Sequence, residues 1–158
     1  LRQTIPVRLH LNPWGAPPRR LPAGFTQRDP AGCLAAQLVD DGLPVGLGLQ
    51  PLPGGDARVL VSVPERAMLE LLSDVGKLQS LAEARDLVES LPGLRTKVLD
   101  ELLQHTDRIK VVRMAASMAT RMNLPWAAVA EKHSERIGGG ARWVAVGRTG
   151  ERLDLKRP

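Results

Sequence analysis

The residues best placed to do chemistry are cations on one predicted helical segment. Lys110, Arg113, Ser117 and Arg121 fall within an arc of about 80° when successive residues turn by about 100° around a helix axis. Arg108 lies beside them in the sequence. A basic stripe of this kind suits phosphate groups or an acidic protein surface. A solvated helical face is the alternative interpretation of the same residues.

The basic charge of the chain is concentrated at its C-terminal end. The formal net charge is +5, from 22 Lys and Arg against 17 Asp and Glu. Residues 1–106 contain 11 basic and 12 acidic residues, which gives −1, and residues 107–158 contain 11 and 5, which gives +6. Such a concentration is typical of a surface that meets phosphates or an acidic partner. We therefore predict a binding face for nucleic acid or a protein partner made of Arg108, Lys110, Arg113, Arg121, Arg142 and Arg148.

The other reactive residue types form no recognisable catalytic or metal-binding pattern. His10, His105 and His133 are scattered, with no cysteine or carboxylate at ligand spacing, so we interpret each as a surface or capping histidine. The carboxylate pairs at 40–41 and 100–101 are adjacent in sequence and would point apart on a helix. We expect no enzyme activity, no metal and no cofactor. An enzyme whose residues converge only in three dimensions stays open as an alternative.

The composition is that of a cytoplasmic chain of one domain. Among the 158 residues there is one cysteine, Cys33, which excludes an internal disulfide framework. The sequence has neither a secretory signal nor an apolar run of about 18 residues, so we expect no association with a membrane. Because the chain starts with Leu1 and not with Met, we expect a fragment or a processed chain whose upstream part is missing.

The first part of the chain, residues 1–61, has the composition of strands and turns. Of the 13 prolines 10 precede residue 65, as do 8 of the 15 glycines, and both residue types favour turns. We predict, in order, a half-buried strand over 4–11, a Pro-rich loop over 12–24, a short helix over 31–39 and a hairpin with strands at 45–52 and 58–62.

Residues 62–137 have the apolar spacing of about five helices. Two S-x-x-E capping boxes, Ser62 with Glu65 and Ser80 with Glu83, predict the starts of the first two. Two more helices are expected within residues 91–122, where the pattern has one break. The last should run from Trp126 to about Ile137, with Trp126 anchoring it in the core.

Residues 138–158 complete the chain with three glycines and a basic β-hairpin, whose strands we place at 142–146 and 151–155. The predicted fold class is therefore α+β, with N-terminal strands and a Pro-rich loop, a central cluster of helices and a closing hairpin.

The helical part resembles the C-terminal domain of AbiEi-type antitoxins, which belong to type IV, abortive-infection toxin–antitoxin systems. The resemblance rests on the runs VSVPERAMLELLSDV at 61–75 and SLAEARDLVESLPGLRTKVLDELLQHTDRIKVVRMAASMA at 80–119. It covers residues 61–155 and, more loosely, 5–60. Its structural signature is Ser62, Glu65 and Arg66, which we interpret as a helix cap and a surface ion pair. The family stretch often has a further basic residue where this chain has Val112.

The resemblance implies an antitoxin effector domain with a part in phage defence. It implies that the domain counteracts a cognate nucleotidyltransferase-like toxin, in the type IV manner without an obligatory stable complex. It also implies an upstream winged helix in the full-length protein, which binds operator DNA and represses the operon. No winged-helix pattern precedes Thr4, so we expect that domain to lie outside this chain.

A function from another class stays open beside this one. The chain could be a protein–protein interaction or homodimerisation module whose basic face meets an acidic partner, and a concentration-dependent mass without nucleic-acid binding would favour it. If the basic stripe faces phosphates instead, Lys110→Ala or Arg113→Ala should weaken binding uniformly across sequences.

Overall fold

The computed structural model describes five stretches of the chain, one single residue between them and the backbone of two further strands. The described residues are 38–39, 42–44, 46–55, 57, 60–77 and 79–137, with the strands at 143–146 and 152–155. The chain divides into unit 1, Leu1–Gln37 with Pro51–Val61, and unit 2, Leu38–Gln50 with Ser62–Pro158. The strand predicted over 4–11, the loop over 12–24 and nearly all of the helix over 31–39 lie outside the described residues.

Two short strands lie where the chain passes from one unit to the other. Strands β1 (Leu49–Pro51) and β2 (Leu60–Ser62) form a two-stranded sheet, which confirms the predicted hairpin with shorter strands than expected. The first strand is shorter because Gly46 and Gly48, with φ of +85° and +75°, place the preceding residues in turns.

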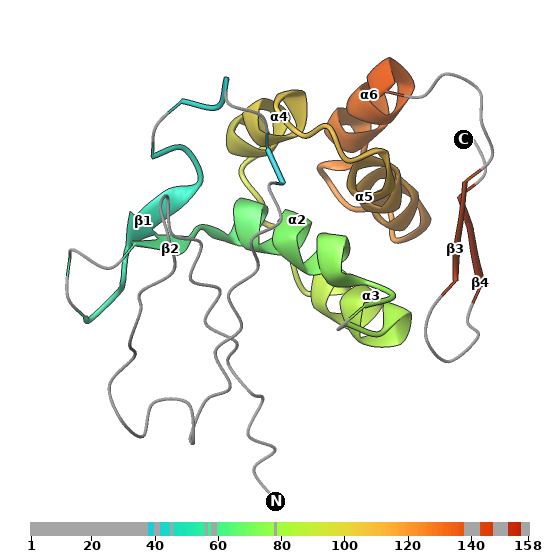
Figure 1. Ribbon diagram of the computed structural model, residues 1–158, viewed down its shortest axis with the longest axis horizontal. Coiled ribbons are helices and arrows are strands. Elements are labelled where there is room, and N and C mark those ends of the chain that lie inside the picture. The colour runs from blue at the N-terminus through green and yellow to red at the C-terminus, as the bar shows by residue number, and fades with distance from the viewer. Residues whose placement is uncertain are drawn as a thin grey trace, which may run out of the picture. The chain divides into compact units, whose positions relative to one another are not determined.

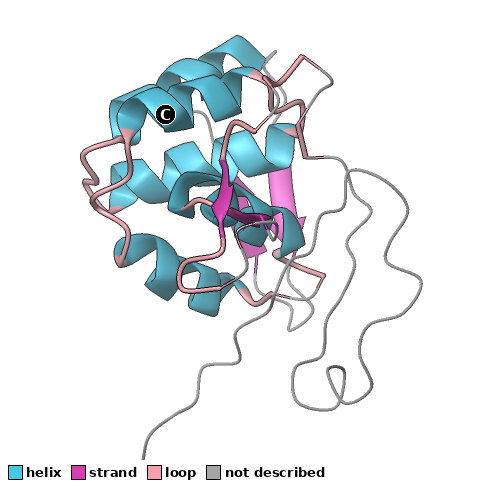
Figure 2. Cartoon of the chain, turned by 90° about the vertical axis from the view of Figure 1, so that its left-hand side faces the viewer, coloured by secondary structure: helices cyan, strands magenta, loops and turns pink. Residues whose placement is uncertain are grey.

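Five helices form the described part of unit 2 and confirm the predicted helical cluster. They are α2 (Pro64–Asp74), α3 (Leu81–Glu89), α4 (Thr96–Gln104), α5 (Ile109–Arg121) and α6 (Ala127–Ile137). Helix α5 packs against α2, α3 and α6, and α6 also packs against α4 (Figure 1). Figure 2 shows that helix accounts for most of this part of the chain.

The core of unit 2 is built around α5, which is buried along most of its length. Val111, Ala115 and Met118 are buried, as the apolar spacing predicts, and Met122 packs against the core while partly exposed. Alanines at 115, 116 and 119 let neighbouring backbones approach closely, because their side chains occupy little space. Trp126 is fully buried and its Nε1 donates a hydrogen bond to the carbonyl oxygen of Leu91 at 2.9 Å. Its predicted role as the anchor of the last helix is therefore confirmed.

Helix α5 ends in a Schellman motif. Asn123 has φ of +51°, a conformation that asparagine tolerates better than most residues. The N–H of Leu124 donates to the carbonyl oxygen of Ala119 at 2.9 Å, and the N–H of Asn123 donates to that of Thr120 at 3.1 Å. This turn reverses the chain and brings α6 back against α5.

The two predicted capping boxes have different outcomes. At α3 the Ser80 hydroxyl accepts from the N–H of Glu83 at 3.1 Å, so this cap is confirmed. At α2 the box of Ser62 with Glu65 is wrong, because the N-cap residue is Val63 and it makes no side-chain cap. Pro64 at the first helical position starts α2 instead, since its φ is already helical and it has no N–H to satisfy.

The C-terminal hairpin is present. Strand β3 (Trp143–Val146) pairs with β4 (Arg152–Leu155) in antiparallel register, with Trp143 opposite Leu155 and Val146 opposite Arg152. Strand β4 lies beside α5. In the described part of the chain, the helices are too short or too polar to cross a membrane.

Candidate functional site

Two of the predicted basic residues lie at the start of α5, Arg108 as its N-cap and Lys110 in its first turn, and both are directed toward the end of α2. Lys110 Nζ donates to the carbonyl oxygen of Val75 and lies 3.5 Å from that of Ser73. Arg108 Nη1 donates to the Ser73 hydroxyl at 2.8 Å. Helix α2 has no basic residue in its own last turn. Because the carbonyl end of a helix carries partial negative charge, the two cations stabilise it.

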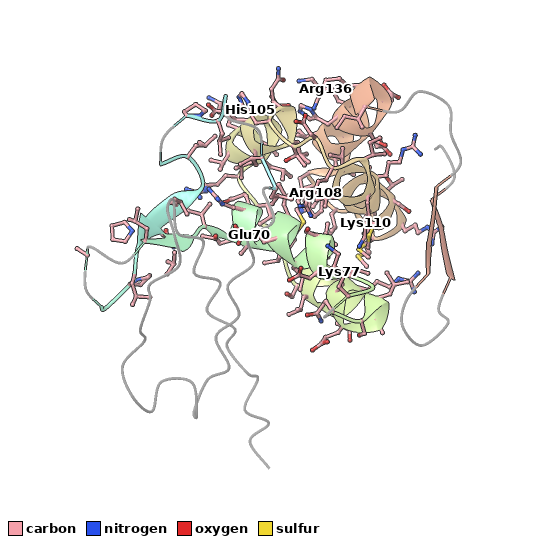
Figure 3. The ribbon with its side chains drawn as sticks, in the orientation of Figure 1. Glu70, Lys77, His105, Arg108, Lys110 and Arg136 are labelled. Atoms are coloured by element: carbon pink, nitrogen blue, oxygen red, sulfur yellow. The ribbon has the colours of Figure 1, made fainter. Side chains whose placement is uncertain are left out.

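A third cation lies near this pair. Figure 3 shows Lys77, Arg108 and Lys110 gathered at the end of α2, and the charges of Lys77 and Arg108 both act on Lys110. Burial of its ammonium group, followed by the charge of Lys77, lowers the pKa of Lys110, although Asp74 acts in the opposite direction. Lys110 is therefore within range of two other cations and of the buried carboxylate of Asp74.

The remaining predicted basic residues are placed differently. Arg113 is half-buried in the middle of α5, and Arg121 is exposed in the last turn, where a cation suits the end of the helix. Arg142 and Arg148 lie outside the described residues. Contact of any of these six residues with nucleic acid or a partner stays a prediction.

Glu65 and Arg95 form a pair that joins the first turn of α2 to the start of α4. Glu65 Oε1 accepts from the backbone N–H and the Nε of Arg95 at 2.8 and 3.0 Å, and its Oε2 accepts from Nη2 at 2.8 Å. These hydrogen bonds lower the pKa of Glu65 from its ordinary value of 4.5 to about 2, despite the opposing effect of burial. The same pairing raises the pKa of Arg95. Two motifs of the resemblance, V-P-E-R and L-P-G-L-R, thus bind each other.

The interpretation of Glu65 and Arg66 as a cap and a surface ion pair is wrong. Glu65 is 1% exposed and Arg66 is 3% exposed, and each has partners elsewhere. Arg66 Nε donates to Glu70 Oε1 at 2.9 Å. Ser62, expected as the cap, donates to Glu70 Oε2 at 2.8 Å. The three signature residues therefore have structural roles, with Glu65 and Arg66 buried and Ser62 half-buried, which their positions at the start of a helix do not reveal.

A second polar cluster, centred on the buried His133, joins α6 to α4. His133 is fully buried, with its Nε2 at 2.7 Å from Asp100 Oδ1, and its Nδ1 accepts from Arg136 Nε at 3.4 Å. Because Nδ1 accepts, Nε2 carries the proton and donates to the carboxylate. The hydrogen bonds from His133 and then from Lys132 lower the pKa of Asp100. The interpretation of His133 as a surface histidine is therefore wrong.

Arg136 also stabilises the end of α4. Its Nη2 donates to the carbonyl oxygens of Leu103 and Gln104 at 3.0 and 3.1 Å (Figure 3). Helix α4, like α2, has no basic residue in its own last turn. His105 is the C-cap residue of α4, in agreement with its interpretation as a capping histidine.

The open alternative is an enzyme whose residues come together only in the folded chain. His133 and Asp100 are a histidine and a carboxylate that come together in this way. Both ring nitrogens of His133 already have protein partners, and the ring is inaccessible to solvent. The arrangement therefore orients α6 on α4 and offers no free nitrogen to a substrate. Sequence analysis missed this pair because its members are 33 residues apart.

Comparison with protein families gives a match over most of the chain. Residues 9–156 match the model of the family described as "Transcriptional regulator, AbiEi antitoxin, Type IV TA system". This is the family that the motifs at 61–119 resemble, so the resemblance is confirmed. Neither the comparison with curated proteins nor the comparison with solved structures found a match.

Proposed function

Because the chain belongs to the AbiEi antitoxin family of type IV toxin–antitoxin systems, we propose that its helical part is the effector that counteracts a nucleotidyltransferase-like toxin. The observation that carries this proposal is the family match over residues 9–156. The effector acts in the cytoplasm, as part of phage defence by abortive infection. It neutralises the toxin without an obligatory stable complex.

We further infer that the domain acts by binding and not by catalysis. The buried polar groups support this inference, because they pair with one another across helices. Glu65 is held by Arg95, and His133 by Asp100 and Arg136, so their reactive atoms serve the fold.

We propose that the full-length protein binds the operator and represses the operon, and that basic residues of α5 contribute to this DNA binding. Arg121 is exposed and Arg113 is half-buried, so we take Arg121 as the better candidate for contact with phosphates and Arg113 as the second. They are eight residues apart and about 12 Å apart along the helix axis at 1.5 Å per residue, on the same side of α5.

Co-expression tests the effector function. The chain is expressed with the neighbouring nucleotidyltransferase-like gene product, together with an R113A/R121A variant and an R85A/K97A variant. The second is a matched control, because Arg85 and Lys97 are exposed cations on α3 and α4. We expect the parent and the control to restore growth.

The outcome for the R113A/R121A variant locates the activity. Loss of rescue by a folded variant would place toxin neutralisation on the basic side of α5, and full rescue would assign those arginines to DNA alone. If the folded parent chain fails to restore growth, the effector proposal is wrong. A concentration-dependent mass would then indicate the interaction or dimerisation module.

A further inference from the structure

The chain leaves unit 2 after Gln50 and re-enters it at Ser62, which are two of the three places where it passes between the units. We name them by their anchored residues: the outgoing segment is Leu47–Gly48 and the returning segment is Ser62–Val63. The two are joined to each other, because the N–H of Val63 donates to the carbonyl oxygen of Gly48 at 2.9 Å.

Each connecting segment also has a hydrogen bond to a side chain of α2. Arg66 Nη1 donates to the carbonyl oxygen of Leu47 at 3.4 Å, which holds the outgoing segment. The Ser62 hydroxyl donates to Glu70 Oε2 at 2.8 Å, which holds the returning segment. All of these residues lie within unit 2.

The two side chains of α2 that hold the segments form an ion pair with each other. Arg66 Nε lies 2.9 Å from Glu70 Oε1, one helical turn away, and the side chains are 3% and 12% exposed. At this exposure, water has little access to replace a lost partner, so each contact depends on the other.

The backbone at Gly48 is an independent sign that the outgoing segment fits closely against Arg66. Its φ of +75° is in the region that favours glycine. A Cβ atom at this position would lie 3.0 Å from Arg66 Cδ and 3.1 Å from Leu102 Cδ2. A side chain there would therefore push Arg66 away from Leu47.

We propose that the Arg66–Glu70 pair is a single anchor for the outgoing and the returning segment, and that its loss opens both while the helical core stays folded. The anchor lies on α2, and the packing of α5 against α6 does not involve it. A segment that is held by a few polar contacts commonly opens at a lower free-energy cost than global unfolding.

Hydrogen exchange of the whole chain tests the anchor. The readout is the amide of Val63, whose acceptor is Gly48, compared with amides in the middle of α5. In Arg66→Gln we expect the Val63 amide to exchange about tenfold faster or more, because charge-assisted hydrogen bonds are lost, while α5 keeps its parent rates. Lys132→Gln is the matched control, since it removes one cation from an exposed ion pair, and it should leave Val63 unchanged.

Ser62→Ala is the milder variant, which keeps the test valid if Arg66→Gln does not fold. It should accelerate exchange at Val63 in the same direction. In the double variant the acceleration should be less than the product of the single effects, because both side chains act through Glu70. An unchanged Val63 rate, or a rise shared equally by the amides of α5, would overturn the proposal.

Discussion

Lys110 Nζ, in the first turn of α5, donates a hydrogen bond to the carbonyl oxygen of Val75, the C-cap residue of α2. Arg136 of α6 does the same for the last carbonyl groups of α4. Neither α2 nor α4 has a basic residue in its own last turn. Part of the positive charge that follows residue 106 is therefore used inside the fold, where it stabilises helices that come earlier in the chain.

Lys110→Ala should lower the free energy of unfolding by about 1–2 kcal/mol, because it removes a partly buried cap from the end of α2. Arg121→Ala is the matched control, since it removes an exposed cation from the same helix, and its effect should stay within about 0.5 kcal/mol. Urea unfolding followed by circular dichroism measures both. Equal effects of the two substitutions would contradict the capping role.

The Glu65–Arg95 pair should make stability depend on pH in the acid range. The pKa of Glu65 is about 2 in the folded chain and 4.5 ordinarily, so the folded state binds the proton more weakly. The pair's contribution is therefore fully present above pH 4.5 and is lost as the pH falls toward 2. With screening at the 59% exposed side chain of Arg95, we expect Glu65→Gln to cost about 2 kcal/mol at neutral pH.

Unfolding of the parent chain and of Glu65→Gln, compared from pH 7 to pH 2, measures this dependence. The stability difference should be constant above pH 5 and should shrink below 4.5, because only the parent chain has a titrating carboxylate at position 65. A difference that stays constant down to pH 2 would show that another group controls acid unfolding.

Local pattern is enough to predict the helices of this chain but not their polar partners. Apolar spacing indicates which side of α5 is buried, and the serine at the start of α3 predicts its cap, since both signals lie within one or two turns. The same reasoning fails at Ser62 and Glu65. Their partners are Glu70 and Arg95, and the second lies 30 residues away, where only the packed helices bring it.

The basic residues of α5 are a second case in which the sequence pattern does not predict the polar partners. Helical geometry places Lys110, Arg113 and Arg121 on one side of α5, but it does not reveal what faces that side. Packing brings the end of α2 to Lys110, which gives this residue a structural partner. His133 was likewise expected at the surface, because a histidine in a polar stretch gives no sign of burial until Asp100 is placed beside it.

The cluster around His133 predicts a ranking of three substitutions. His133→Ala should cost about 2–4 kcal/mol, because it empties a fully buried site and leaves Arg136 and Asp100 without their shared partner. Arg136→Ala should cost about 1 kcal/mol through loss of the cap on α4. Lys132→Ala should stay within about 0.5 kcal/mol, since its pair with Asp100 is exposed on both sides. Chemical denaturation checks the order, and a larger effect at Lys132 than at His133 would contradict it.

Trp126→Phe tests the anchor of α6. The substitution keeps an aromatic ring but removes the N–H that donates to Leu91 and part of the buried volume, so we expect a loss of about 1–3 kcal/mol. Thermal unfolding measures this loss. A transition temperature equal to that of the parent would show that α6 does not depend on the hydrogen bond from Trp126 to Leu91.

If Arg121 contacts DNA, substitutions at the two ends of α5 should have different effects: one should weaken DNA binding, and the other should lower the stability of the fold. In the full-length protein, Arg121→Ala should weaken operator binding at all sequences and reduce the slope of log K against log salt by about 0.9, the value expected for one lost phosphate contact. Its stability should stay that of the parent, because Arg121 is exposed. Lys110→Ala should show the opposite pattern, since its ammonium group is hydrogen-bonded to α2 and its pKa is lowered by burial.

Titration of operator DNA between low and physiological salt gives both slopes, and equal affinity of Arg121→Ala and the parent at every salt concentration would remove Arg121 from the contact. A slope reduced by Lys110→Ala in a chain of unchanged stability would instead return the contact to the start of the helix.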